Sequence, residues 1–175
     1  DDSIKHPRLE VVITVDEETG MDGAREIDLS MLKGSRLLNL DSEEEGIFLT
    51  SCAGGARVDC RLQPEFMEMS GLEYELLIGG LAGGHSGVEI HKERGNANKL
   101  AGRLLWHLYL EKVQLGLISA QGGLADNAIP RETVVRVLVA PEQKEGFVSA
   151  VTAFEKEVKA ELATKDPDFC IVIKE

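Results

Sequence analysis

Three consecutive acidic residues, Asp16-Glu17-Glu18, follow directly on the apolar segment 9–15. In such a run one carboxylate can hold a metal ion while its neighbour accepts a proton from a water that the metal activates, because the turn of the chain splays the two side chains apart. Glu17 and Glu18 fit this division of roles. A solvated acidic loop is the more common explanation of an isolated run of this kind, because charged loops are the norm, so the run alone does not establish a metal site.

An acidic residue at the end of another predicted strand strengthens the metal interpretation. Segments 9–15 and 36–40 are predicted strands on either side of a helix at 24–32, and the second strand runs straight into Asp41. A helical crossover between neighbouring strands makes them parallel, so both strands are expected to end at the same edge of one sheet. Open α/β sheets bind their ligands outside that edge. We therefore expect Asp41 near the acidic run, whereas Glu43 to Glu45 are expected to form a solvated face.

The histidines provide the next candidates. His85 lies in Gly83-Gly84-His85-Ser86-Gly87, where the glycines let the backbone approach a ligand closely and a rigid turn can present the imidazole ring. A turn histidine with no chemical role is the alternative. His91 is ambiguous, His107 is expected at the edge of the core beside an apolar helix stripe, and His6 is expected at the surface.

The second part of the chain has a different pattern. Strand-like and helix-like segments alternate there so that both helices can cover one face of a sheet, which describes an α+β sandwich. The composition changes near Gly54-Gly55, where we place a domain boundary. The predicted strands span residues 58–66, 74–81, 113–120, 133–139 and 169–173, and the predicted helices span residues 96–111 and 142–164.

Composition excludes several functional classes. The chain has 175 residues, 43% of them apolar, and a net charge of −12. This apolar share is typical of a folded domain, and the negative charge disfavours binding to nucleic acid or anionic lipid. The apolar runs are too short to cross a membrane, and the start lacks the features of a secretory signal, so cytoplasm is the expected location. Cys52, Cys60 and Cys170 are expected to be reduced thiols.

Several well-known catalytic and nucleotide-binding motifs are absent from the sequence. Ser86 does not sit in a Gly-x-Ser-x-Gly elbow, and the chain contains no His-Glu-x-x-His pair and no phosphate-binding loop with Lys-Ser or Lys-Thr. Serine hydrolase and nucleotide-binding functions are therefore disfavoured.

Six motifs in order carry a family resemblance that covers nearly the whole chain. They resemble the aminoacyl-histidine dipeptidase family, the cytosolic Xaa-His dipeptidases or bacterial carnosinases. The motifs are Thr14-Val15-Asp16-Glu17-Glu18-Thr19-Gly20-Met21, Leu40-Asp41-Ser42-Glu43-Glu44-Glu45-Gly46, Cys52-Ala53-Gly54-Gly55, Gly83-Gly84-His85-Ser86-Gly87, Arg94-Gly95-Asn96-Ala97-Asn98-Lys99 and Asn127-Ala128-Ile129-Pro130-Arg131-Glu132.

The resemblance implies a di-zinc peptidase in which a lid domain, α+β and ferredoxin-like, interrupts an α/β catalytic domain. Residues 1–55 would belong to the catalytic domain and residues 56–175 to the lid, which would also form a homodimer. Matched motif by motif, Glu17 resembles the general base, and Glu18 and Asp41 resemble ligands of the two zinc ions. His85 resembles the lid histidine that stabilises the oxyanion. Residues that match lid motifs and are expected to hold the substrate carboxylate are Asn98, Asn127 and Arg131.

The chain departs from the family pattern in its metal ligands. The upstream His-x-Asp pair, the bridging Asp and the C-terminal ligand His of the family have no counterpart in this sequence. A catalytic zinc needs about three protein ligands, so the remaining ligands are expected outside this chain. We therefore expect an internal fragment of a dipeptidase for Xaa-His substrates such as carnosine, inactive by itself.

Two alternatives remain open at this stage. The parent protein could be a related di-zinc amidohydrolase, such as a deacylase or a tripeptidase. The isolated chain could also act as a non-catalytic α+β dimerisation module.

Overall fold

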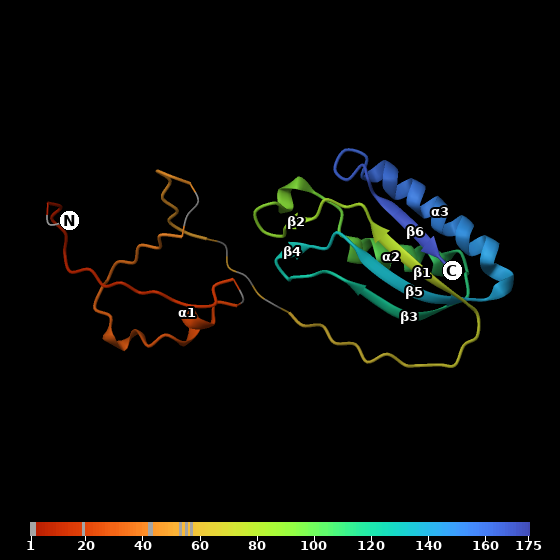
Figure 1. The fold of residues 1–175 in the computed structure, drawn as a ribbon, viewed down its shortest axis with the longest axis horizontal. Coiled ribbons are helices and arrows are strands. Elements are labelled where there is room, and N and C mark those ends of the chain that lie inside the picture. Colours follow the sequence, from red (N-terminus) through yellow and green to blue (C-terminus); the bar gives the residue numbers. More distant parts are fainter. Residues whose placement is uncertain (1–2, 19, 42–43, 53, 55, 57) are drawn as a thin grey trace. The chain divides into compact units, whose positions relative to one another are not determined.

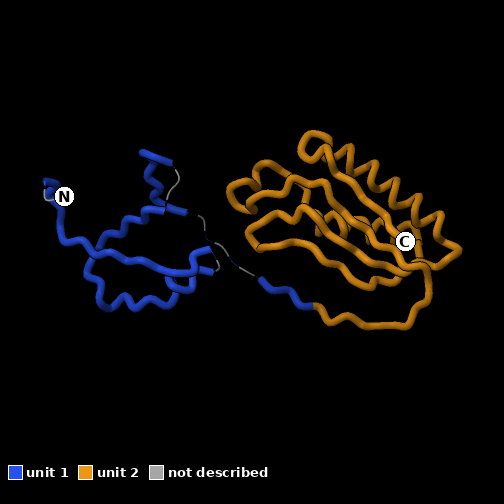
Figure 2. Tube along the Cα trace, in the orientation of Figure 1, with its two compact units in different colours: residues 1–61 blue, residues 62–175 orange. Residues whose placement is uncertain are grey.

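The computed structural model describes residues 3–18, 20–41, 44–52, 54, 56 and 58–175 (Figure 1). The chain divides into two compact units, Asp1–Arg61 and Leu62–Glu175, which Figure 2 distinguishes by colour. The sequence predicts a domain boundary near Gly54-Gly55, and Gly55 lies outside the described residues. Each unit is described by itself.

The C-terminal unit is built on a four-stranded antiparallel sheet. Its strands lie in the order β3-β5-β1-β6, and two helices pack on one face (Figure 1). Along the chain the elements are arranged as strand, helix, strand, strand, helix, strand, which is the ferredoxin-like order. The main elements are β1 (Leu72–Gly79), α2 (Ala97–Leu110), β3 (Leu115–Gly122), β5 (Thr133–Val139), α3 (Lys144–Glu161) and β6 (Cys170–Lys174).

The core results from the residue spacing in these elements. Alternate residues of each central strand face the helices, because successive side chains of a strand point to opposite faces. Each helix contributes a stripe of residues three or four apart to the same core. The side chains that fill it include Tyr74, Leu76 and Ile78 of β1, Val135, Val137 and Val139 of β5, Leu100, Leu104 and Leu108 of α2, and Phe147, Val151, Phe154 and Val158 of α3.

Most elements predicted for this unit are observed. The strand expected over residues 133–139 has those bounds, and both helices lie within one to three residues of the predicted limits. His107 is half-buried with its ring 5.6 Å from that of Phe154, as expected for a residue at the edge of the core. The strand predicted at 58–66 is wrong, since those residues have no regular structure.

The N-terminal unit differs from the prediction. Its described residues form a five-residue helix α1 (Asp22–Glu26) and a 3-10 helix η1 (Leu29–Met31), in place of one helix over 24–32. Neither segment 9–15 nor segment 36–40 is a strand in the described part of this unit. Segment 9–15 is instead held by two hydrogen bonds to the residues after η1. Glu10 Oε2 accepts them from the backbone N–H groups of Lys33 and Gly34, at 2.8 and 2.9 Å.

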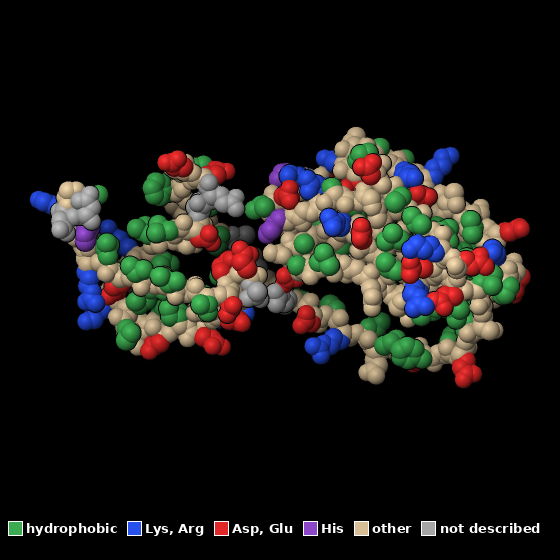
Figure 3. All heavy atoms as spheres, in the orientation of Figure 1, with side chains coloured by type: hydrophobic (Ala, Val, Ile, Leu, Met, Phe, Trp, Pro, Cys, Tyr) green, Lys and Arg blue, Asp and Glu red, His purple; other side chains and the backbone are tan. Residues whose placement is uncertain are grey.

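The physical reason is the lack of a packing partner. Apolar side chains of both segments are solvent-exposed, Val11 by 83% and Leu40 by 90%, and hydrophobic side chains are plainly visible on this unit in Figure 3. A strand needs neighbours for its backbone hydrogen bonds and a covered face for its side chains. None of the described residues up to Arg61 is buried, so this unit supplies neither.

Among the described residues, no helix has the length and hydropathy needed to span a bilayer. All three cysteines are unpaired, with Cys52 and Cys60 exposed and Cys170 half-buried.

The core assignment can be tested by substitution in α2. Leu104 is fully buried, so Leu104→Ala removes apolar contacts and leaves a cavity, which we expect to lower the free energy of unfolding by about 2–5 kcal/mol. Leu110 in the same helix is 58% exposed, and Leu110→Ala should cost less than about 1 kcal/mol. Urea unfolding measures both. Equal losses would show that the buried face of α2 is misassigned.

Candidate functional site

The loop between β1 and α2 carries the histidine singled out by the sequence. Within it, a two-residue strand β2 (Gly84–His85) pairs with β4 (Ala128–Ile129), so that His85 lies opposite Ala128. The Ser86 backbone N–H donates to the Asn127 carbonyl at 2.8 Å. The loop is therefore attached to the segment that precedes β5, although the two are far apart in sequence.

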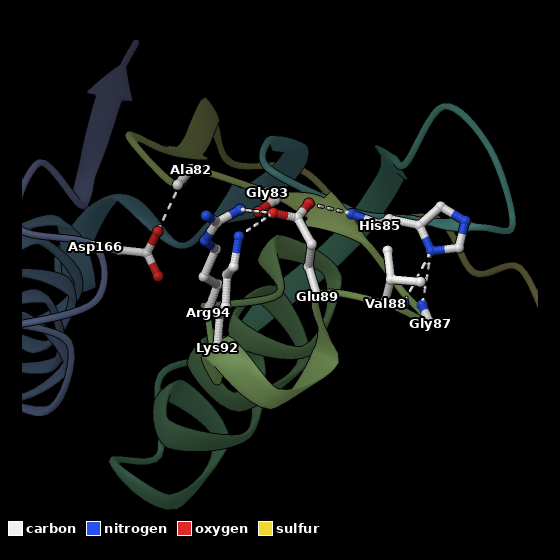
Figure 4. A network of polar contacts seen from close by, with 9 residues as sticks. All are labelled: Ala82, Gly83, His85, Gly87, Val88, Glu89, Lys92, Arg94 and Asp166. Carbon is white, nitrogen blue, oxygen red and sulfur yellow. Dashed lines mark hydrogen bonds and ion pairs between the residues drawn. The ribbon is translucent and has the colours of Figure 1, made fainter. Parts of the chain in front are cut away.

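The His85 ring is held by one of its nitrogens. Its Nδ1 lies 3.0 Å from the Gly87 backbone nitrogen and 3.3 Å from that of Val88, and both N–H groups donate to it (Figure 4). An Nδ1 that accepts hydrogen bonds carries no proton, so the neutral ring carries its proton on Nε2. The side chain is solvent-exposed. His85 thus presents a hydrogen-bond donor that can interact with a negatively charged oxygen.

Glu89 connects the histidine to two cations. Its Oε2 accepts from the His85 backbone N–H at 2.9 Å, while Lys92 Nζ lies 2.5 Å and Arg94 Nη1 lies 3.5 Å from its Oε1 (Figure 4). The hydrogen bond from Lys92, then the one from His85, together with the two positive charges, lowers the pKa of Glu89 to about 2. Arg94 Nη1 also donates to the Gly83 carbonyl at 2.5 Å. The carboxylate therefore stays ionised at neutral pH and ties the loop together.

Glycine is required where the loop passes this network. Gly84 has φ +139, and a Cβ there would lie 2.6 Å from Arg94 Nη1 and 2.7 Å from Glu89 Oε2. A side chain would displace both charged groups. The glycine that the sequence suggested for close approach to a ligand is thus needed for close approach to the loop's own side chains.

The other predicted lid residues lie at the same end of the C-terminal unit. Asn127 pairs through its carbonyl with the His85 loop, and Arg131 lies beside Gly83, whose added Cβ would be 3.3 Å from Arg131 Cβ. Asn98 is at the start of α2. The structure therefore brings these three residues into the neighbourhood of the His85 loop.

Asn98 has both ends of its amide engaged. Its Oδ1 accepts from Thr133 Oγ1 at 2.6 Å, and its Nδ2 donates to the Gly122 carbonyl at 3.3 Å. Gly122 is the last residue of β3 and Thr133 the first of β5, so the amide holds the two strand ends together. This structural use was not anticipated from the sequence, which suggested contact with a substrate carboxylate.

The acidic candidates lie in the N-terminal unit. The carbonyl of Asp16 (φ +59) accepts from the backbone N–H groups of Gly20 and Met21, at 3.2 and 2.7 Å, and closes a turn around Glu17 and Glu18. Thr19 of this turn and Ser42 and Glu43 lie outside the described residues.

Glu17 and Glu18 are exposed, and so is Asp41. Within the described parts of the chain, no group of three or more His, Cys, Asp or Glu side chains is placed to hold a metal.

Sequence reasoning missed the residues that shape the loop. Glu89 is four residues after His85 and is followed by Lys92 and Arg94, a charge spacing that could have suggested a local ion-pair network. Asp166 is almost fully buried and accepts hydrogen bonds from the Ala82 and Gly95 backbone N–H groups, both at 2.7 Å. Nothing in the local sequence around Asp166 marks it.

The Glu89 network predicts an acid-labile loop. Because the pKa of Glu89 is lowered from 4.5 to about 2 in the folded loop, its stabilisation is complete above pH 4.5 and is lost as pH falls from 4.5 through about 2. Lys92→Ala should raise the midpoint of the Glu89 titration towards 4.5, as followed by the chemical shift of its carboxyl carbon. Lys99→Ala, a change at another exposed lysine, is the control. An unchanged midpoint in Lys92→Ala would contradict this account.

Comparison with known proteins gives a consistent result. Residues 78–166 match the family described as the peptidase dimerisation domain. The chain is 39% identical over 175 residues to the cytosol non-specific dipeptidase of Escherichia coli (strain K12), which covers 99% of this chain and 36% of that protein. The crystal structure of aminoacylhistidine dipeptidase from Vibrio alginolyticus matches with a TM-score of 0.65 and 33% identity, covering 93% of this chain and 33% of that one.

These matches confirm the resemblance inferred from the six motifs and the α+β class of the fold. The chain spans roughly a third of the length of both relatives, 36% and 33%. The family match covers residues from the end of β1 to the connection after α3, and so includes the His85 loop, α2 and α3. The chain belongs to the peptidase dimerisation domain family.

Proposed function

We propose that this chain is part of a metal-dependent dipeptidase in which His85 binds the oxyanion that develops at the scissile carbonyl. The observation that carries this proposal is the fixed ring of His85, whose Nδ1 accepts two backbone N–H groups and whose exposed side chain therefore donates from Nε2. A preorganised donor of this kind favours the transition state over the substrate. The 39% identity to a dipeptidase supports the reaction class.

Glu18 and Asp41 are the proposed metal ligands in this chain. Carboxylate oxygens suit zinc, but a catalytic zinc needs about three protein ligands. The family's His-x-Asp pair, bridging Asp and C-terminal ligand His have no counterpart in this sequence, and we propose that the other ligands lie outside this chain. Two zinc ions, when bound, would polarise the scissile carbonyl and make the attacking water more acidic.

Glu17 is the proposed general base. It is adjacent to Glu18 in an exposed turn that hydrogen bonds to the Asp16 carbonyl hold closed. Its carboxylate would accept a proton from the attacking water and deliver it to the nitrogen of the scissile bond. The nitrogen would then leave as a neutral amine and not as an anion.

The proposed substrates are dipeptides with a C-terminal histidine. Asn127 and Arg131 lie around the His85 loop, and the Arg131 guanidinium suits a substrate carboxylate because it can form two parallel hydrogen bonds. Asn98 would contribute by holding the ends of β3 and β5 together beside them. One relative is named for aminoacylhistidine and the other is named non-specific, so a dipeptide without histidine belongs in any substrate test.

We also propose a division of this chain between two domains of the full protein. Residues 1–55 would complete part of a catalytic domain, and residues 56–175 would form the lid through which two copies associate as a homodimer. The many exposed apolar side chains of segments 9–15 and 36–40 support the first assignment, because apolar surface that gathers in a patch usually meets another protein surface. The cytosolic relative supports a cytoplasmic location.

A substrate panel tests the proposed function. The full protein that contains this chain would be incubated with a His-terminated dipeptide, a dipeptide without histidine, a tripeptide and an N-acyl amino acid. Release of histidine from the first, abolished by a chelator and restored by zinc, is the expected result. Faster hydrolysis of the tripeptide or the acyl amino acid would show a related amidohydrolase instead. Inactivity towards all four would favour a non-catalytic dimerisation module.

The role of Glu17 gives a separate prediction. Glu17→Gln keeps the size of the side chain but removes the proton acceptor, so turnover should fall by about 10²–10⁴-fold while the zinc content is unchanged. Glu26→Gln, at another exposed acid of the same unit, should leave both unchanged. Steady-state kinetics and metal analysis of the purified full protein measure the two effects. Turnover within about tenfold of the unmodified protein would exclude Glu17 as the base.

A further inference from the structure

We propose that Asp166 is a positioning residue that fixes both ends of the His85 loop and thereby sets the place of the His85 ring. This inference rests on the proposed function for the catalytic role of His85. Asp166 itself lies outside the loop, in the connection between α3 and β6.

One carboxylate bridges the two ends of the loop. Asp166 Oδ1 lies 2.7 Å from the Ala82 nitrogen, and Oδ2 lies 2.7 Å from the Gly95 nitrogen (Figure 4 shows the first contact). Residues 83–94, between these two points, include both His85 and Glu89. Hydrogen bonds from N–H groups to an ionised carboxylate at this distance are short and about twice as strong as neutral ones. The carboxylate therefore fixes where the loop leaves the sheet and where it enters α2.

Asp166 is itself held in place by its backbone. Its N–H donates to the Leu162 carbonyl at 2.8 Å, and its own carbonyl accepts from the Phe169 N–H at 3.1 Å. Only 2% of the residue is exposed. A buried carboxylate is costly unless every oxygen is hydrogen-bonded, and here each oxygen has a backbone donor. Asp166 is thus held by its backbone within the α3–β6 connection and by its side chain to the loop.

Two glycines leave room for this close contact. A Cβ at Gly95 would lie 3.1 Å from Leu162 Cδ1 and 3.4 Å from Asp166 Oδ2, and a Cβ at Gly80 would lie 1.9 Å from the Asp168 carbonyl oxygen. Gly80 also has φ +72, a conformation that other residues rarely adopt. At both ends of the loop, a glycine therefore allows close packing against the α3–β6 connection.

The chemistry of the side chain makes the role testable. Asparagine has nearly the shape of aspartate but offers one oxygen acceptor and one NH₂ donor. In Asp166→Asn one of the two loop N–H groups would face a donor and lose its partner. The loop should then be attached at one end only, and the His85 ring should occupy a wider range of positions.

Amide exchange tests the attachment directly. In the full protein, hydrogen–deuterium exchange of peptides covering residues 80–96 should be about tenfold faster or more in Asp166→Asn, because one buried hydrogen bond is lost. Asp168→Asn, two residues along and exposed, is the matched control and should exchange like the unmodified protein. If Asp166→Asn does not fold, the unmodified protein still decides: exchange of the Ala82 and Gly95 amides at the rate of an unstructured peptide overturns the proposal.

A double-mutant cycle tests the link to His85. Asp166→Asn should lower kcat by about tenfold or more and change KM by less than about threefold, because His85 is proposed to act on the transition state. In a His85→Ala background the same change should cost less than about twofold, since there is no ring left to position. A purely structural role would give equal losses in both backgrounds and would overturn the proposal.

Different results would contradict the proposed function and the positioning role of Asp166. If His85→Ala lowers kcat but Asp166→Asn does not, the proposed function stands and the positioning role of Asp166 is wrong. If the unmodified protein hydrolyses none of the four test substrates, the proposed function is wrong, and the positioning role in catalysis is wrong with it. Unchanged exchange in Asp166→Asn would show in addition that the carboxylate does not hold the loop.

Discussion

The candidate site depends on the hydrogen-bond partners that the backbone of the long β1–α2 loop finds. A connection that leaves a sheet and returns to a helix gives up the regular hydrogen bonds of both, so its N–H and C=O groups need other partners. Here the pairing of β2 with β4 supplies some of them, Arg94 donates to the Gly83 carbonyl, and two carboxylates accept from three of the N–H groups. Asp166 accepts from both ends of the loop, and Glu89 accepts from the middle, at the N–H of His85 itself. Hydrogen bonds, several of them to charged groups, therefore order the loop, and its histidine stays exposed to a ligand.

The fold beneath the loop makes this arrangement possible. The packing of α2 and α3 on one face of the sheet fixes the end of β1, the start of α2 and the connection after α3 in one region, although they are distant in sequence. Asn98 then joins the ends of β3 and β5 at the same side. The core thus supplies position, and the polar contacts above it supply orientation. A substitution in the core would act on stability, whereas one in the loop would act on the geometry of His85.

Local patterns in the sequence predict the parts of the structure that are locally determined. The alternating valines of β5 and the leucine stripe of α2 fix their elements, since each pattern has the period of its own secondary structure. The pair β2 and β4 has two residues in each strand, too few to show a period. Asp166 could not be found either, because its partners lie 84 and 71 residues away and are backbone groups that every residue type possesses.

The N-terminal unit shows the opposite case, in which a strong local pattern does not produce the predicted element. Segment 9–15 is rich in β-branched apolar residues, as strands buried on both faces are, yet Val11 and Ile13 remain exposed by 83% and 87%. The strand propensity of β-branched residues comes mainly from how well their side chains pack in a covered, hydrogen-bonded sheet. It is not an intrinsic preference of the backbone. The pattern and the observed exposure agree if the segment is one strand of a sheet whose other strands this unit does not contain. Such a sheet also accounts for the turn of Glu17 and Glu18, which comes directly after the segment and would then lie at the sheet's edge.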